Sequence, residues 1–179
     1  METRLGKIMV GKAGGTASSG SKTYKISLPS AWVTAMGFAG EGGQVLLSFD
    51  GEGITIRPKQ SMEQYRALRT AQGHTLLEIR YYNGSTLCTL IYADKAVRDL
   101  CTKNCTEQAV KTAFGKNPVP SWADLEAFLE ERCIPRQRAG LREYLEALGL
   151  DEYDPLAIIQ KTKGRMAEDD QWLEVREIK

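Results

Sequence analysis

Histidine is scarce in this sequence: His74 is the only one among 179 residues. Nucleophilic and acid–base sites combine a nucleophile, a base and an orienting group, and histidine is the usual base. The three consecutive carboxylates at 168–170 point apart on any regular backbone. The loop AGGTASSGSK (13–22) lacks the GxxxxGK[ST] order of a phosphate-binding loop. We therefore predict that the protein is not an enzyme.

Zinc-type ligand pairs are also missing. The four cysteines contain no CxxC pair, and they are Cys88, Cys101, Cys105 and Cys133. We expect buried or half-buried free thiols and no metal or other cofactor. The sequence has neither a run of 18 apolar residues nor the residue order of a signal peptide. These absences predict a cytoplasmic protein without a membrane contact.

Charge of one sign is not in excess. The chain has 24 Lys and Arg against 23 Asp and Glu, and its 42% hydrophobic and 26% charged residues are typical of a globular protein. The near-neutral total argues against a uniformly basic nucleic-acid-binding protein. The first 28 residues are nevertheless locally basic, with Glu2 as the only acid against Arg4, Lys7, Lys12, Lys22 and Lys25.

The residue pattern divides the chain into two predicted domains, 1–60 and 61–179. The first domain begins with two strands, 6–12 and 23–28, on either side of the Gly/Ser loop. A short helix follows, with Ser30 at its N-cap and Gly37 at its C-terminal end. The runs QVLLSFD and ITIRP then predict a second hairpin.

In this region KISLPSAWVTAMGF, a glycine-rich turn and VLLSFDGEGITIRP follow one another. This order resembles the AbrB, MazE and SpoVT swapped-hairpin family, in which a strand ends on a Leu-Pro or Ile-Pro dipeptide and a short helix closes on a glycine. The resemblance covers residues 6–59. It implies an α+β fold whose first domain is a swapped-hairpin β-barrel in an intertwined homodimer, because one hairpin pair cannot bury its apolar face alone.

The family's basic hairpin residues contact double-stranded DNA. Carried over to this chain, the phosphate-contacting residues are Lys7, Lys12, Lys22 and Lys25. We expect Lys12, Lys22 and Lys25 to project away from Ile26 and Leu28. The chain departs from the family at Ser30, Ala31 and Trp32, where many members have Lys or Arg. The hairpin also has no arginine beyond Arg4, although base readout in the major groove depends on Arg, Asn or Gln.

The second domain begins with a predicted connecting helix at 61–73, followed by a hairpin at 76–92. The Asn83-Gly84 dipeptide predicts a type I′ turn in that hairpin. Residues 93–114 are predicted as an interrupted helix.

Helical patterns cover 121–164. Ser121 with Asp124 predicts the start of the first helix. Gly149 predicts the end of the second, and Asp154 with Pro155 the start of the third. The run QWLEVREI predicts a final strand.

Residues 122–175 resemble the helical end of small HipA-like accessory proteins from mobile elements, and we attach no activity to this resemblance. The segment contains a basic cluster, Arg136, Arg138 and Arg142. These arginines have two interpretations: contact with phosphate or an acidic protein, or intrahelical ion pairs with Glu143 and Glu146.

The leading hypothesis is a dimeric DNA-binding regulator from a bacterial mobile element. The alternative is a protein-binding inhibitor of a host nuclease, like the anti-CRISPR proteins that block a Cas9-type effector, with the first domain serving dimerisation or autoregulation. A toxin-neutralising role, as in MazE antitoxins, comes third, because an ordered second half differs from the disordered tails of antitoxins.

Overall fold

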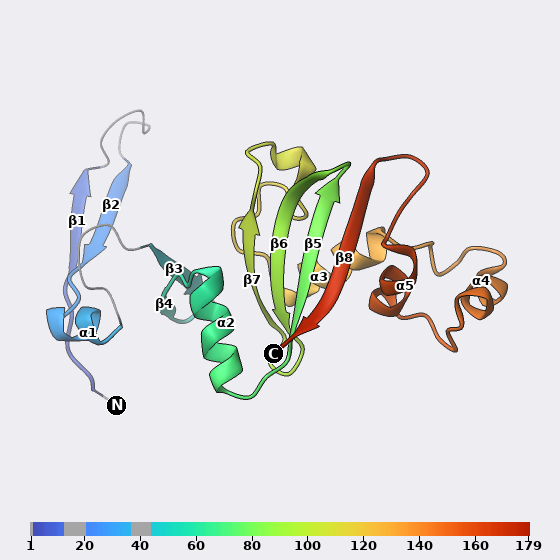
Figure 1. Cartoon of the computed structure of the whole chain (residues 1–179). Helices are drawn as coiled ribbons and strands as arrows, with labels where there is room; N and C mark the ends of the chain where they lie inside the picture. Colours follow the sequence, from blue (N-terminus) through green and yellow to red (C-terminus); the bar gives the residue numbers. More distant parts are fainter. Residues whose placement is uncertain (1, 13–20, 37–43) are drawn as a thin grey trace. The chain divides into compact units, whose positions relative to one another are not determined.

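The computed structural model describes residues 2–12, 21–36 and 44–179, and its fold class is α+β, as the sequence predicts. The chain divides into two compact units, residues 1–59 and residues 60–179, which we name unit 1 and unit 2 (Figure 1). The strands of the described residues form small open sheets and no closed barrel.

Unit 1 consists of two antiparallel hairpins and one short helix. The elements are β1 (Ile8–Lys12), β2 (Lys22–Ile26), α1 (Ser30–Ala35), β3 (Val45–Phe49) and β4 (Ile54–Pro58). Within the described ranges, β1 pairs only with β2 and β3 only with β4, so each hairpin is a separate two-stranded sheet. The predicted strands are confirmed: β4 coincides with the predicted run ITIRP, and the other three are slightly shorter than expected.

The start of α1 corrects one prediction. Pro29, rather than Ser30, occupies the N-cap position, and no side chain caps the helix. Pro29 has φ −58° and ψ 133°, which is the extended conformation that a proline favours and that an N-cap requires. Its carbonyl accepts hydrogen bonds from the N–H groups of Trp32 and Val33 at 3.0 and 3.1 Å. The predicted C-terminal Gly37 lies outside the described residues.

Unit 2 is built on a four-stranded antiparallel sheet in the order β7-β6-β5-β8. The strands are β5 (Leu76–Asn83), β6 (Thr86–Asp94), β7 (Asp99–Asn104) and β8 (Gln171–Ile178). β8 is the final strand predicted from the sequence, and it returns from the end of the chain to pair with β5 along its full length. The first strand of unit 2 is therefore a central strand of the sheet.

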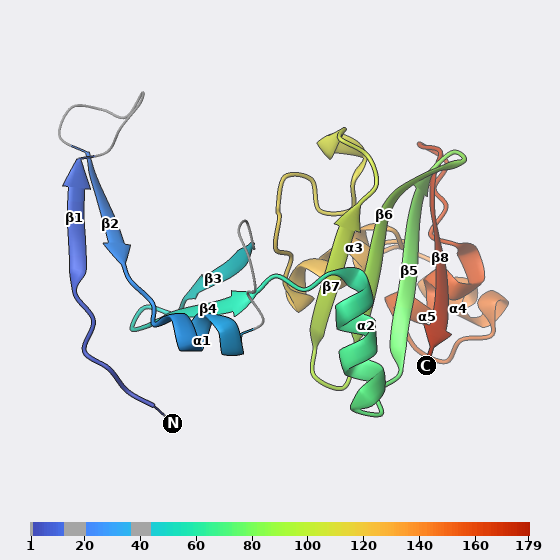
Figure 2. The same cartoon turned by 60° about the vertical axis from the view of Figure 1, so that its left-hand side comes forward.

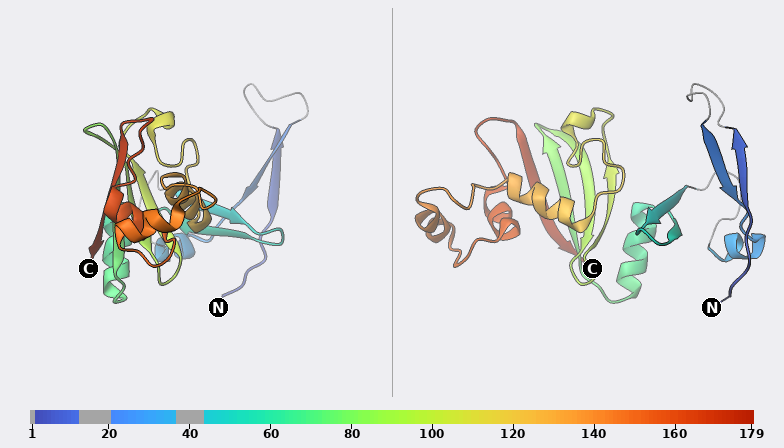
Figure 3. Two further views of the ribbon diagram at one scale, coloured as in Figure 1. Left: turned by 90° about the vertical axis from the view of Figure 1, so that its right-hand side faces the viewer. Right: turned by 180° about the vertical axis from the view of Figure 1, so that it is seen from behind.

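Helices cover both faces of this sheet. The helices of unit 2 are α2 (Met62–Ala71), α3 (Trp122–Glu131), α4 (Leu141–Leu148) and α5 (Pro155–Thr162), with the short 3₁₀ helix η1 (Ala109–Lys111) before α3. Figure 2 shows α2 in front of the sheet and α3 behind it, and Figure 3 shows α3 crossing the opposite face. Serine caps begin α2 and α3, because Ser61 with Gln64 and Ser121 with Asp124 form capping boxes.

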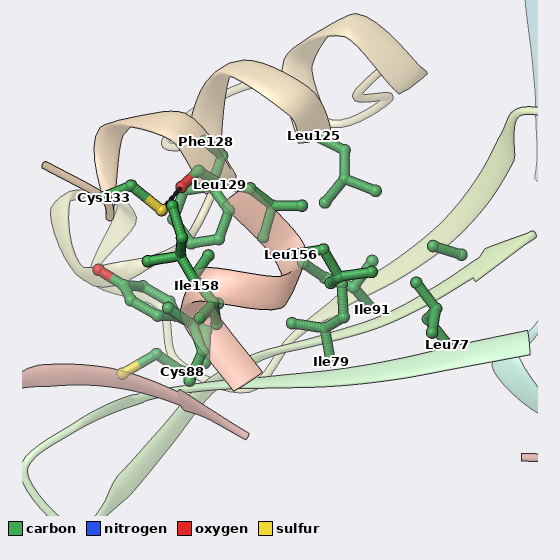
Figure 4. Close-up of a cluster of buried hydrophobic side chains, with 14 of the residues drawn as sticks. Leu77, Ile79, Cys88, Ile91, Leu125, Phe128, Leu129, Cys133, Leu156 and Ile158 are labelled. Carbon is green, nitrogen blue, oxygen red and sulfur yellow. Dashed lines mark hydrogen bonds between the residues drawn. The ribbon is translucent and has the colours of Figure 1, made fainter. Parts of the chain in front are cut away.

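The main core lies between the sheet and helices α3 and α5. Leu125, Phe128 and Leu129 of α3 project toward Ile79 of β5 and Ile158 of α5 (Figure 4). A smaller cluster on the other face joins α2 to the sheet through Met62, Tyr65, Leu76 and Tyr92. Leu68 of α2 lies outside this cluster and is 41% exposed.

The predicted helix at 93–114 is wrong. The segment contains the end of β6, strand β7 and the short helix η1, and Arg98 has a φ of 51° in the turn between the strands. β7 pairs with β6 from Thr89↔Asn104 to Asp94↔Asp99. Without β7, one edge of β6 would have unpaired backbone N–H and C=O groups. Pairing with β7 gives these groups hydrogen-bond partners, and this tertiary interaction overrides a weak local preference for helix.

The turn of the predicted hairpin is shifted by one residue. Asn83 pairs with Thr86, so the two-residue loop is Gly84-Ser85 rather than Asn83-Gly84. Gly84 has a φ of 57°, whereas Ser85 is not among the residues with positive φ. A type I′ turn needs positive φ at both central residues, so that predicted turn type is wrong. The two predicted strands themselves are confirmed.

Candidate nucleic-acid interface

The β3–β4 hairpin has one apolar and one largely polar face. Residues directly opposite in an antiparallel pair lie on the same face, and the faces alternate along the strand. The apolar face is formed by the pairs Val45↔Pro58, Leu47↔Ile56 and Phe49↔Ile54. The other face is formed by Leu46↔Arg57 and Ser48↔Thr55. The hairpin is therefore amphipathic.

The β1–β2 hairpin is also two-faced. One face contains the pairs Ile8↔Ile26 and Val10↔Tyr24, and the same face ends in Lys12↔Lys22 beside the Gly/Ser loop. The opposite face contains Met9↔Lys25 and Gly11↔Thr23. The apolar side chains thus gather on one face, with a pair of lysines at its end.

Neither apolar face is covered by the described residues of unit 1. Among residues 2–12, 21–36 and 44–59, no residue is buried. Large apolar side chains are strongly exposed on both hairpins, with 71% for Phe49, 71% for Ile54, 62% for Leu47 and 62% for Ile8. An isolated two-stranded hairpin is at best marginally stable in water, and contiguous exposed apolar side chains are typical of interaction surfaces.

The structure separates the four predicted phosphate-contacting lysines into two groups. Lys12 and Lys22 are directly opposite each other, on the face of Ile26 and Tyr24. Lys25 lies on the other face opposite Met9, and Lys7 immediately precedes β1. The expectation that Lys12, Lys22 and Lys25 project away from Ile26 is wrong for Lys12 and Lys22. Lys22 is four residues from Ile26, and strand side chains alternate with a period of two.

The Lys12↔Lys22 pair is electrostatically unfavourable as it stands. Like charges directly opposite on neighbouring strands destabilise a hairpin. In the described part of the chain, no ion pair or hydrogen bond involves the ammonium group of Lys7, Lys12, Lys22 or Lys25. These exposed cations are therefore available to an external anion.

The arginines of the second basic cluster have mostly intramolecular partners. Arg142 forms an ion pair with Glu146 one turn along α4, with Nε and Oε1 3.0 Å apart. Arg136 pairs with Glu130 of α3 at 2.6 Å, and its guanidinium lies 4.2 Å from the centre of the Tyr153 ring. Arg138 forms no ion pair within the described ranges. The structure thus provides carboxylate partners for two of the three arginines.

Two buried polar clusters of unit 2 were missed in the sequence. His74 Nδ1 lies 2.6 Å from Oδ2 of Asp94, whose side chain is fully buried and also pairs with Arg69. Arg132 is 7% exposed and donates to Asp169 and to the carbonyl oxygen of Gly164. The partners are 20 or more residues apart along the chain, so no local spacing signals either cluster.

The Arg132 cluster shifts the pKa of one carboxyl group. Hydrogen bonds from Arg132 lower the pKa of Asp169 below its ordinary value of 3.8, and burial opposes this shift only partly. The carboxylate form of Asp169 is therefore favoured in the folded chain.

The His74 and Arg132 clusters each connect separate elements of unit 2, so their role is structural.

The thiols and carboxylates offer no metal centre in the part of the chain that the structure describes. Of the four cysteines, Cys88 and Cys133 are buried, Cys101 is half-buried and Cys105 is exposed. Burial raises the pKa of the Cys133 thiol to about 11. A nucleophilic thiolate at Cys133 is thus disfavoured near neutral pH.

None of the helices among the described residues has the length and the apolar character that crossing a membrane requires.

Comparison with known proteins found no matching family model, no matching curated protein and no matching solved structure.

Proposed function

We propose that the chain is a dimeric DNA-binding regulator in which unit 1 of one copy pairs with unit 1 of a second copy. The observation that carries the proposal is the pair of amphipathic hairpins whose apolar faces are exposed. In this proposal the swapped-hairpin barrel forms only in the dimer, because no described residue of unit 1 is buried in the single chain.

A second copy is the occupant that best matches these faces. Covering Leu47, Phe49 and Ile54 gains about 1.5–3 kcal/mol for each side chain that becomes fully buried. The free energy gained by burying three such side chains is large enough to offset the entropic cost of association. The complementary surface is present on every copy of the chain, since each has two hairpins of the same kind.

DNA binding is supported by the charge pattern of the β1–β2 hairpin. Lys12 and Lys22 lie side by side without a carboxylate, and a phosphate between them would relieve their mutual repulsion. Arg4 is the only arginine in the β1–β2 region, so few side chains there suit base readout. We therefore propose binding dominated by phosphate contacts, with a weak dependence on DNA sequence.

The test is a salt titration of duplex DNA binding by the full chain, with the Lys12→Gln/Lys22→Gln variant beside wild type. The slope of log affinity against log salt is expected to fall by about 0.9 for each phosphate that the variant no longer neutralises. Lys95→Gln/Lys116→Gln is the matched control. Both lysines are exposed in unit 2, and replacing them removes the same charge as the hairpin variant does. Sedimentation equilibrium on the same samples is expected to give twice the monomer mass.

Two results would refute the proposal. A monomeric mass at micromolar concentration rules out the paired hairpins, and absence of DNA binding at low salt rules out the regulator. In the second case the inhibitor of a host nuclease becomes the better hypothesis.

A further inference from the structure

Trp172 is the centre of a cationic and aromatic cluster at the start of β8. Its indole stacks on the ring of Tyr82 with 4.3 Å between the centroids and 7° between the planes. Lys163 Nζ and the guanidinium carbon of Arg165 lie 5.6 and 5.2 Å from the centre of the same indole. We name Tyr82, Lys163, Arg165 and Trp172 the Trp172 cluster.

Among the residues that the structure describes, the two cations of this cluster have no carboxylate partner. Ion pairs between described residues include Arg69, Arg80, Arg98, Arg132, Arg136, Arg142 and Arg176 of unit 2, but neither Lys163 nor Arg165. The acidic residues at 168–170 and 174 do not neutralise these two cations. Asp169 is bound to Arg132 and Glu174 lies 3.9 Å from Arg80, while Glu168 and Asp170 are exposed and pair with neither cation. Two uncompensated cations thus share one aromatic ring.

The backbone that carries these cations is rigidly held. The carbonyl oxygen of Gly164, between them, accepts hydrogen bonds from Arg132 Nε and Nη2 at 3.1 and 2.8 Å. A Cβ at Gly164 would lie 2.7 Å from a methyl carbon of Leu173, so the chain packs tightly at this position. Trp172 is itself fixed by a hydrogen bond from Nε1 to the carbonyl oxygen of Gly84 at 2.8 Å. A preorganised site loses less entropy when it binds a ligand.

Unit 2 contains a second arrangement that provides an internal comparison. Arg98 and Lys163 are the only residues other than glycine with positive φ in the part of the chain described, and each places its cation over an indole. Positive φ is uncommon for such residues and marks a position where the surroundings impose the conformation. Arg98 lies 5.5 Å from the Trp122 ring but pairs with Glu126 at 3.0 Å. The charge is neutralised at Arg98 and not at Lys163.

We propose that the Trp172 cluster is a second phosphate-binding surface, through which unit 2 contacts the DNA backbone. This inference rests on the proposed function, because DNA binding by the chain supplies the phosphate. Lys163 acts as a point charge, and the planar guanidinium of Arg165 can donate two hydrogen bonds to one phosphate. The indole holds both cations in place until the anion binds.

The experiment measures duplex DNA binding by the full chain as a function of salt. The Lys163→Gln/Arg165→Gln variant is expected to lower the slope of log affinity against log salt by about 0.9 for each phosphate left without its cation. The matched control is Arg98→Gln/Arg142→Gln, which removes the same charge from two arginines that already have carboxylate partners. The control is expected to keep the wild-type slope. Equal slopes for the two double variants would overturn the inference.

The hairpin variant separates this inference from the proposed function. Loss of affinity in Lys12→Gln/Lys22→Gln with no change in Lys163→Gln/Arg165→Gln would reject the Trp172 cluster and leave the hairpin interface. The reverse result would support the cluster and reject the hairpin as the contact surface. A wild-type chain that does not bind DNA would reject both.

A polyglutamate probe distinguishes phosphate from carboxylate as the anion. The inference expects polyglutamate to bind the Lys163→Gln/Arg165→Gln variant and wild type equally weakly. A reduction of polyglutamate binding as large as the reduction of DNA binding would assign the cluster to an acidic protein instead.

Discussion

Unit 1 and unit 2 have similar numbers of strands but opposite relations to their apolar residues. Unit 2 buries a continuous cluster that includes Ile79, Ile91 and Ile158, each with no exposed surface. The described residues of unit 1 include no buried side chain, although the strands of its hairpins are at least as rich in Ile, Leu, Val and Phe as the strands of unit 2. An apolar pattern therefore specifies a strand face, while a core requires a second layer to cover that face.

The largest effect is expected in the core of unit 2. Phe128→Ala removes a ring that contacts Tyr81 edge-on at a centroid distance of 5.1 Å, and it should cost about 3–5 kcal/mol of unfolding free energy. Urea denaturation followed by circular dichroism measures this loss. Val110→Ala, at a side chain that is 89% exposed, is the control and should change stability by less than about 0.5 kcal/mol. Similar costs for both variants would show that the two positions do not differ in burial.

Arg132→Met is expected to cost almost as much. The substitution leaves the Asp169 carboxylate and the Gly164 carbonyl oxygen without their main donor, and breaking such a partly buried pair typically costs about 3–5 kcal/mol. The measurement is again the free energy of unfolding in urea. A loss below about 1 kcal/mol would contradict this role, since that is the usual worth of an exposed pair.

The same pair predicts a pH dependence. The folded pKa of Asp169 is lowered from 3.8, chiefly by Arg132, so its stabilising contribution is complete above 3.8 and is lost as pH falls through the lower folded pKa. Wild type should therefore lose stability in this acidic range more steeply than Arg132→Met. Parallel stability curves for the two proteins would disprove the coupling.

An intermediate effect is expected at the exposed face of unit 1. Phe49→Ser removes an apolar side chain that the proposed dimer buries, and it should weaken dimerisation by about 10- to 100-fold, corresponding to about 1.4–2.8 kcal/mol. Sedimentation equilibrium measures the dissociation constant. Ser48→Ala, on the opposite face of the same strand, is the matched control. Equal constants for the two variants would exclude the face of Phe49 as the interface.

The smallest effect is expected for chelator and reductant. Cys88, Cys105 and Cys133 are free thiols, and the described residues contain no metal-binding group of His, Cys, Asp or Glu. EDTA or dithiothreitol should leave the thermal midpoint of unit 2 unchanged. A drop of more than about 5 °C would reveal a bound metal or a disulfide, since about 1 kcal/mol shifts the midpoint of a domain of this size by roughly that amount.

The sequence by itself determined the elements with strong local signals. Ser121 with Asp124 predicted the start of α3, and Gly149 predicted the end of α4, where it has a φ of 69°. The alternation in both hairpins of unit 1 also predicted their strands. These signals are local because caps, turns and strand faces depend on hydrogen bonds and geometry within a few residues.

Tertiary structure alone decided the features that join distant residues. The pairing of β7 with the edge of β6 replaced a predicted helix, and the return of the chain from α5 placed Trp172 against Tyr82. The sequence contains no spacing that marks Arg132 as a partner of Asp169, or Lys163 as a partner of Trp172. Their contacts follow from sheet order and loop geometry, because a side chain's neighbours are set by the packing of elements far apart in the chain.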